Sequence, residues 1–197
     1  MGELRGGSMA ERDAAGVQLL HESFIRWRDM PPVRLTLERR DAWVVALGLQ
    51  SAVTYPGFAG SSWAPALVAV GRQLQTATAD DPQVLAAAEP GWAVHDTGAP
   101  AGDPDTDAAG IRLMVEAYTR WESMPPVSVT AERRDMWAVL MGCQVALKHP
   151  SFAPANMLGR IVESAGRQLQ DGLCDDPELY ALAEAGWDRA ADVEQSR

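Results

Sequence analysis

The residues best suited to hold a charged ligand are Arg39, Trp43 and Gln50, which share one predicted helix. On a helical wheel at about 100° per residue, their side chains fall in a single narrow stripe. An arginine fork beside an indole face and an amide can hold a carboxylate, a phosphate or a planar base. The same residue types recur at the same spacing later in the chain, as Arg133, Trp137 and Gln144. We take these six residues as candidates for ligand or partner binding.

The same stripe also fits an architectural role. In this interpretation Trp43 packs in the core, and the Gln50 amide bonds to a backbone carbonyl. Arg39 or Arg40 forms a salt bridge with one of three carboxylates, those of Glu22, Asp41 and Asp80. The charged residues that recur in both stretches nearly balance in sign, which favours internal salt bridges. The solvent exposure of Arg39 and Trp43 separates the two interpretations.

Tryptophan supplies a further candidate. Six of the seven tryptophans recur as pairs at corresponding positions, which is typical of core packing or of contacts between related units. Trp63 is the exception, because its counterpart is the aliphatic Leu158. It follows a loop rich in Gly and Ser, so it is a candidate anchor for a partner protein. Packing of Trp63 on the second half of the chain is the alternative.

The sequence carries no motif of a catalytic or cofactor site. The GxSxG, HExxH, GxGxxG, P-loop and EF-hand patterns do not occur. None of the three histidines has a histidine counterpart, and Cys143 and Cys174 do not have the spacing of zinc ligands. We therefore expect a non-enzymatic protein with no catalytic residue, no metal and no cofactor, and with two free thiols.

An internal repeat organises the chain. Residues 13–59 align without a gap with residues 107–153, and 25 of these 47 pairs are identical. The strings GRQLQ, DDP and GW then recur one residue out of that register. A repeat of this kind predicts a duplicated structural unit. We call residues 13–94 the first half and residues 107–190 the second half.

Each half is predicted to form four helices, so the fold class is all-α. The second helix is apolar on every side and therefore buried, with Thr36 or Thr130 as its N-cap. A glycine within it, Gly48 or Gly142, indicates a close helix crossing. Glycines 91 and 186 are predicted to end the fourth helix as C-caps.

We expect the two tandem four-helix repeats to pack with pseudo-two-fold symmetry. The remaining segments are predicted to be a disordered N-terminal tail at 1–12, a linker at 95–106 and a frayed C-terminus at 191–197.

Charge and hydropathy narrow the function classes. The net charge of −10 argues against a mainly electrostatic grip on nucleic acid. No apolar run has the length of a membrane span. We expect a cytoplasmic monomer or homodimer that binds a protein partner, and the leading hypothesis is an interaction or adaptor module. The alternative is a small-molecule or anion-binding protein that uses the Arg39, Trp43 and Gln50 stripe and its second copy. A DNA-linked regulator is the third and least favoured hypothesis.

Overall fold

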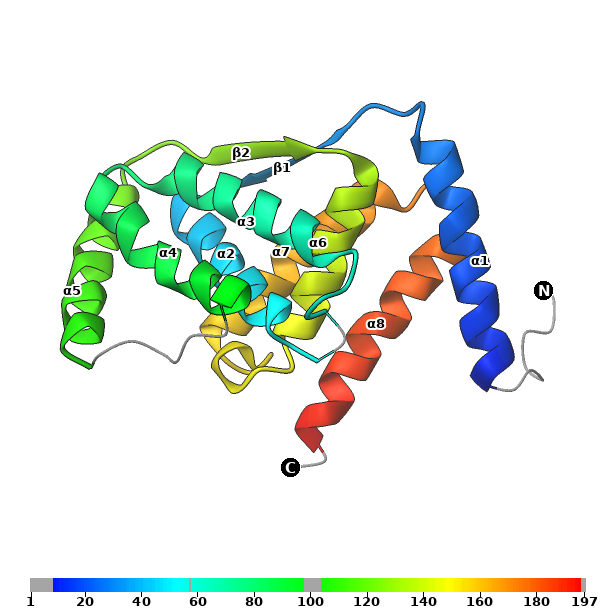
Figure 1. Ribbon diagram of the computed structural model, residues 1–197. Coiled ribbons are helices and arrows are strands. Elements are labelled where there is room, and N and C mark those ends of the chain that lie inside the picture. Colours follow the sequence, from blue (N-terminus) through cyan, green and yellow to red (C-terminus); the bar gives the residue numbers. More distant parts are fainter. Residues whose placement is uncertain (1–8, 57, 98–103, 196–197) are drawn as a thin grey trace.

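The computed structural model describes residues 9–56, 58–97 and 104–195. Within these ranges the chain is mostly helical, with one two-stranded sheet, which confirms the all-α class (Figure 1). The elements of the first half are α1 (Met9–Trp27), β1 (Val33–Leu37), α2 (Arg39–Val53), α3 (Ala64–Thr78) and α4 (Pro82–Thr97). Those of the second half are α5 (Pro104–Trp121), β2 (Val127–Ala131), α6 (Arg133–Ala146), the 3-10 turn η1 (Pro150–Phe152), α7 (Met157–Leu173) and α8 (Pro177–Gln195).

Helices α2 and α6 cross at the centre of the core, with α3 and α7 packed against them. A Cβ atom at Gly48 would lie 3.1 Å from Val162 Cγ2 and 3.4 Å from Ala146 Cβ. A Cβ atom at Gly142 would lie 2.9 Å from Leu49 Cδ2 and 2.9 Å from Leu67 Cδ2. The glycines therefore let the central helices approach closely, as the sequence predicts.

The two extended segments pair with each other as an antiparallel ribbon. Leu35 of β1 faces Val129 of β2, and both side chains are buried. Alternate residues along each strand point to solvent, because side chains alternate between the two faces of a strand. The ribbon therefore joins the halves through backbone hydrogen bonds and covers one side of the helical core (Figure 1).

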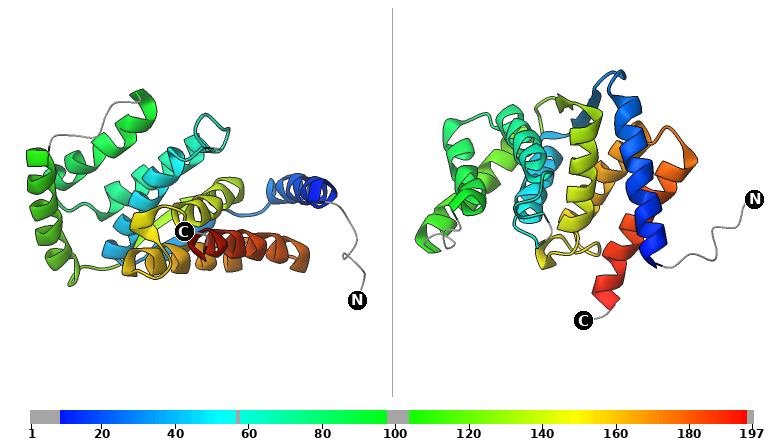
Figure 2. Two further views of the ribbon diagram at one scale, coloured as in Figure 1. Left: turned by 90° about the horizontal axis from the view of Figure 1, so that it is seen from below. Right: turned by 45° about the vertical axis from the view of Figure 1, so that its right-hand side comes forward.

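The first helix of each half packs on the other half. Helix α1 contacts α6 and α8, whereas α5 contacts α4 and α2. Figures 1 and 2 show α1 and α5 at opposite ends of the molecule, each beside helices of the opposite half. The two halves are therefore intertwined, since each contributes a helix to the packing of the other.

The predicted N-caps Thr36 and Thr130 are wrong. Both threonines lie in strands, and the helices begin three residues later, after Glu38 and Glu132, which make no side-chain capping bond. Thr36 Oγ1 instead lies 2.7 Å from Ser128 Oγ across the ribbon. A β-branched residue suits a strand, and pairing between the halves extends that strand through the predicted cap.

The predicted C-caps Gly91 and Gly186 are also wrong. Helix α4 continues through Gly91 to Thr97, and α8 continues through Gly186 to Gln195. Among the described residues, Gly60 alone is a glycine with a positive φ, so neither predicted cap has the left-handed conformation that a C-cap glycine supplies. Both glycines serve packing instead.

The predicted tail, linker and C-terminal segment lie partly outside the described residues. Where they are described they are helical, because α1 begins at Met9, α4 ends at Thr97, α5 begins at Pro104 and α8 ends at Gln195. No helix of the described residues has both the length and the apolar character needed to cross a membrane.

The intertwined packing predicts that the halves stay together after the chain is cut between Thr97 and Pro104. With a protease site inserted there, the two fragments should co-elute on size exclusion, because the strand pairing and the exchanged helices remain. The same sample in urea is the control for complete cleavage. Separate elution in native buffer would show that the covalent link holds the halves together.

Candidate functional site

The guanidinium groups of Arg39 and Arg133 bond to backbone carbonyls. Arg39 Nε donates to Pro125 O at 3.1 Å, and its Nη1 donates to Thr78 O at 2.7 Å and to Ala77 O at 3.2 Å. The last two carbonyls belong to the C-terminal turn of α3, where carbonyls lack helical partners. Arg39 therefore closes the end of α3 and joins it to the extended segment of the other half.

Arg133 makes the corresponding bonds in the second half. Its Nε donates to Pro31 O at 3.2 Å, and its Nη1 donates to Gly172 O at 3.3 Å near the end of α7. The architectural interpretation anticipated a carboxylate partner for Arg39. The acceptors are carbonyls, because the arginine lies between a helix C-terminus and the Met-Pro-Pro turn of the other half.

The tryptophans of the two stripes are buried. Trp43 is 2% exposed, and its ring centroid lies 5.5 Å from that of Trp121 on α5. Trp137 is also 2% exposed, and its centroid lies 5.9 Å from that of Trp27 on α1. The first pair joins α2 to α5, and the second pair joins α6 to α1, so each pair links a central helix to the first helix of the opposite half. The indoles therefore hold the exchanged helices in place.

The glutamines of the stripes bond to helices α4 and α8. Gln50 Nε2 donates to Ala88 O at 2.9 Å, and Gln144 Nε2 donates to Ala183 O at 2.8 Å. A Cβ atom at Gly91 would lie 2.6 Å from Gln50 Oε1, and one at Gly186 would overlap the Gln144 amide. Glycine at these helical positions leaves space for the amide. This packing role explains why both halves have a glycine there, although the helix does not end at it.

The arginines and glutamines predicted to bind a ligand or partner thus bond to backbone carbonyls, and the tryptophans pack in the core. Arg39 and Arg133 are partly exposed, while both tryptophans and both glutamines are buried. Binding by Arg39, Trp43, Gln50 and their counterparts stays a prediction. Of the arginines that follow them in sequence, Arg134 is exposed, whereas Arg40 is partly exposed like Arg39.

Trp63, the unmatched tryptophan, lies at the junction of the two halves. Its ring centroid is 5.6 Å from that of Phe24 on α1, and the Arg134 guanidinium carbon of α6 lies 5.7 Å from the centroid of each ring. In the other half, Arg40 lies over Tyr118 and donates to Met157 Sδ at 3.4 Å. Met157 therefore takes the place that Trp63 occupies, one residue from the Leu158 of the sequence comparison.

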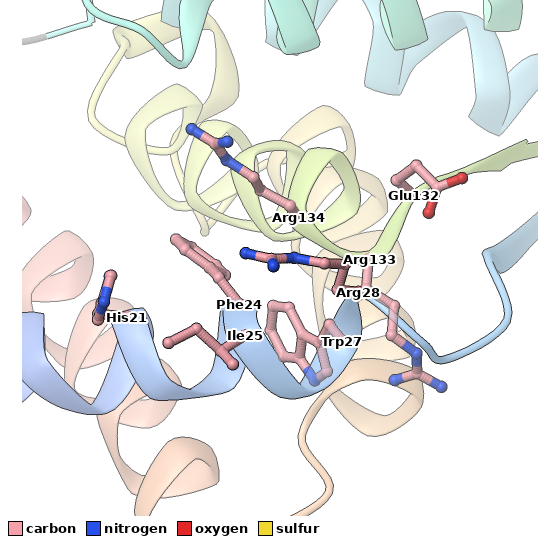
Figure 3. Close-up of a pocket in the computed structure, with 8 residues that line it drawn as sticks. All are labelled: His21, Phe24, Ile25, Trp27, Arg28, Glu132, Arg133 and Arg134. Carbon is pink, nitrogen blue, oxygen red and sulfur yellow. The ribbon is translucent and has the colours of Figure 1, made fainter.

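A surface cleft of about 410 Å³ lies between α1 and α6, and we call it the α1 cleft (Figure 3). Figure 3 shows α1 side chains on one side and the arginines of α6 on the other. The cleft is lined by His21, Phe24, Ile25, Trp27, Arg28, Glu132, Arg133 and Arg134. It contains three arginines against one glutamate, in a chain whose net charge is −10.

Two of these arginines have no acidic partner among the described residues. Arg28 and Arg134 are exposed, and neither forms a salt bridge there. Arg133 is held by carbonyls, which carry no net charge. The α1 cleft therefore concentrates positive charge that the described part of the chain does not pair, which makes it complementary to an anionic group.

Exposed residues extend the cleft along α1. Val17, His21 and Ile25 are exposed at four-residue spacing, with Val17 at 68% and Ile25 at 50%. Residues spaced in this way share one face of a helix. We call these three residues the α1 stripe. The stripe leads to Arg28 and so places an apolar edge beside the cationic cleft.

The corresponding surface in the other half has a different character. The counterparts of His21, Ile25 and Arg28 are Val115, Thr119 and Glu122 on α5. Glu38, Arg39 and Arg40 stand where the cleft has Glu132, Arg133 and Arg134, so that two arginines face two glutamates. Of the residues that line the cleft, the sequence comparison selects Arg133, which both halves share, but not His21, Ile25 and Arg28, because these three differ between the halves.

Asp80 anchors α5 through two hydrogen bonds. Arg120 Nε donates to Asp80 at 2.8 Å, and Trp121 Nε1 donates to it at 2.9 Å. The hydrogen bond from Arg120 lowers the pKa of Asp80 to about 2, with partial burial opposing the shift and the bond from Trp121 adding to it. At α1 the corresponding arginine, Arg26, bonds to Asp175 and Asp176. Trp27 Nε1, the counterpart of Trp121 Nε1, is buried and has no hydrogen-bond partner among the described residues.

The cysteines lack the properties of nucleophiles. Burial raises the pKa of the Cys143 thiol to about 12. Burial, followed by the nearby Asp175 and Asp176, raises that of Cys174 to about 12 as well. A thiol is nucleophilic as its thiolate, so both groups are unreactive at neutral pH. Among the described residues, no group of three or more His, Cys, Asp or Glu side chains is placed to hold a metal ion.

Comparison with known proteins gives no relative from which a function could be carried over. The chain matches no protein-family model, no curated protein and no solved structure.

The fit between Gly186 and Gln144 predicts that Gly186→Ala destabilises the protein. Alanine favours a helix by about 1 kcal/mol over glycine. The added methyl group displaces the Gln144 amide from Ala183 O, so we expect a net loss of about 2 kcal/mol in the free energy of unfolding. Urea denaturation followed by circular dichroism measures it.

Gln144→Ala in the Gly186→Ala background supplies the control. Removing the amide makes room for the methyl group, so the double variant should be more stable than the sum of the single effects predicts. Gly172→Ala is the matched helical control, because its Cβ atom would lie at an ordinary 3.6 Å from Val33 Cγ1. Strict additivity of the two substitutions would contradict the proposed fit.

The lowered pKa of Asp80 predicts an acid-dependent loss of stability. The carboxylate stabilises the folded protein fully above its unfolded pKa near 3.8, and this contribution is lost as pH falls from about 4 through about 2. Asp80→Asn should therefore reduce the free energy of unfolding at pH 5 and leave a smaller difference from the wild type near pH 2. Carbon-13 NMR titration of the Asp80 carboxyl group measures the pKa directly, and Arg120→Ala should raise it.

Proposed function

We propose that this protein is a non-enzymatic interaction module that binds another protein at the junction of its two halves. The observation that carries the proposal is the α1 cleft, where α1 of the first half and α6 of the second half bring together uncompensated arginines and an exposed apolar edge. Exposed apolar residues beside positive charge are typical of protein-binding surfaces, in which arginine is enriched.

The chemistry of the described residues supports a binding role over catalysis. The two cysteines are held in the thiol form, and the conspicuous Arg, Trp and Gln side chains make internal contacts. Enzymes place titratable groups with shifted pKa values in clefts. Asp80, whose pKa is shifted most clearly among the carboxylates, forms part of the anchor of α5.

The proposal includes duplication of an ancestral unit, pseudo-two-fold packing and a cytoplasmic location. Corresponding residues make corresponding contacts, as in the bonds of Gln50 and Gln144 to α4 and α8. The indole of Trp92 donates to Gln75, as that of Trp187 does to Gln170. Exchange of α1 and α5 is the arrangement expected if two swapped subunits were joined into one chain. Unpaired thiols are typical of a reducing compartment.

Site-specific photo-crosslinking tests the proposed surface. A benzophenone amino acid at Ile25 should yield one discrete adduct in host lysate, because Ile25 is exposed at the edge of the α1 cleft. The captured protein, once purified, should bind the wild-type chain with a defined stoichiometry in calorimetry.

The same probe at Thr119, the counterpart of Ile25 on α5, is the matched control and should not yield that adduct. Equal labelling at both positions, or absence of binding between the purified proteins, would contradict the proposed function. Thr119 is exposed as Ile25 is, so accessibility does not distinguish the two positions.

A further inference from the structure

We infer that the partner presents an acidic, amphipathic segment, with carboxylates at Arg28 and Arg134 and apolar side chains along the α1 stripe. The inference rests on the proposed interaction function and adds the chemistry of the partner. It depends on three properties of the described surface, which are its charge, its length and its restriction to one half.

Charge complementarity selects an acidic partner. Arg28, in the turn that follows α1, and Arg134, on α6, both line the α1 cleft, and neither has a carboxylate partner among the described residues (Figure 3). The cation of Arg134 also rests against the rings of Phe24 and Trp63, which fixes it near the cleft. A carboxylate accepts a paired hydrogen bond from a guanidinium, so a side chain of Asp or Glu fits both arginines.

The length of the surface favours a polypeptide segment over a small molecule. Val17 and Ile25 are eight residues apart on α1, which corresponds to roughly 12 Å along the helix axis, and Arg28 follows in the turn after α1. Val17, His21 and Ile25 occupy this distance at one-turn spacing. A partner helix with apolar residues at the same spacing would contact this face and direct an acidic residue to the cleft.

The other half shows that the architecture does not require this surface. The exchanged helix α5 occupies the corresponding position with Thr119 and Glu122 in place of Ile25 and Arg28. Both helices are held by tryptophan pairs, so the fold tolerates either set of exposed residues. The residues that distinguish α1 from α5 are therefore available for recognition.

Fluorescence anisotropy with a labelled helical peptide tests the inference. The probe has Leu at one-turn spacing, Glu between these positions and Ala elsewhere. It should bind the full-length protein, and the affinity should fall as salt is added. Replacement of every Glu by Gln should abolish the binding, and Arg28→Glu or Arg134→Glu should each weaken it by about tenfold.

Arg112→Glu is the matched control. Arg112 is an exposed residue of α5 at the opposite end of the molecule, and this substitution changes the net charge by the same amount as Arg28→Glu. It should leave the affinity unchanged. Urea denaturation should show unchanged stability for Arg28→Glu and Arg112→Glu, which replace exposed side chains, and a small loss for Arg134→Glu, which removes the contacts with Phe24 and Trp63. Circular dichroism should show that all three variants remain folded.

Charge exchange supplies a second readout that a structural role would not produce. The Arg28→Glu, Arg134→Glu double variant should bind a peptide in which Lys replaces Glu, while the wild type should not.

Equal binding of the Gln peptide, equal weakening by Arg112→Glu, or equal binding of a DNA oligonucleotide would overturn the inference. If the Ile25 adduct forms while these peptide results fail, the interaction function stands and the acidic partner is excluded. Loss of the adduct would instead remove the function on which the inference rests.

Discussion

The packing of buried tryptophan pairs between the two halves is the contact on which the rest of the structure depends. Trp43 receives Trp121 of α5, and Trp137 receives Trp27 of α1, so each central helix holds the first helix of the opposite half. Buried aromatic pairs contribute both a large apolar area and a preferred geometry. Because these pairs join segments that are far apart in the chain, they fix the exchange of α1 and α5. That exchange in turn places α1 beside α6 and creates the α1 cleft.

Glycine and glutamine make the second set of central contacts. The buried amides of Gln50 and Gln144 need backbone acceptors, because an unpaired amide in the core is costly. Helices α4 and α8 supply those acceptors, and Gly91 and Gly186 provide the necessary space. The glycines at positions 71 and 166 accommodate the indoles of Trp92 and Trp187 in a similar way. Small residues in these helices therefore reflect packing against large polar or aromatic neighbours.

Residues that both halves keep and residues that differ contribute to different properties. In the shared stripe, the arginines bond to carbonyls at helix ends, the tryptophans fill the core, and the glutamines donate hydrogen bonds to buried backbone carbonyls. The unshared residues Trp63 and Arg28 lie instead at the surface where the halves meet. The α1 cleft combines residues of both kinds, because Arg133 and Arg134 are shared by the halves whereas Arg28 is not.

The sequence by itself determined the all-α class, the buried central helices and the close crossing at Gly48 and Gly142. These features follow from periodic apolar residues and local backbone preferences, which act over a few residues. The tertiary structure decided that Thr36 belongs to a strand, that Gly91 lies within a helix and that α1 packs on the second half. Two halves of similar sequence do not reveal whether a helix packs within its own half or on the other half, because nearly the same residues satisfy both arrangements. The α1 cleft depends on that choice, so its residues come together only in the folded chain.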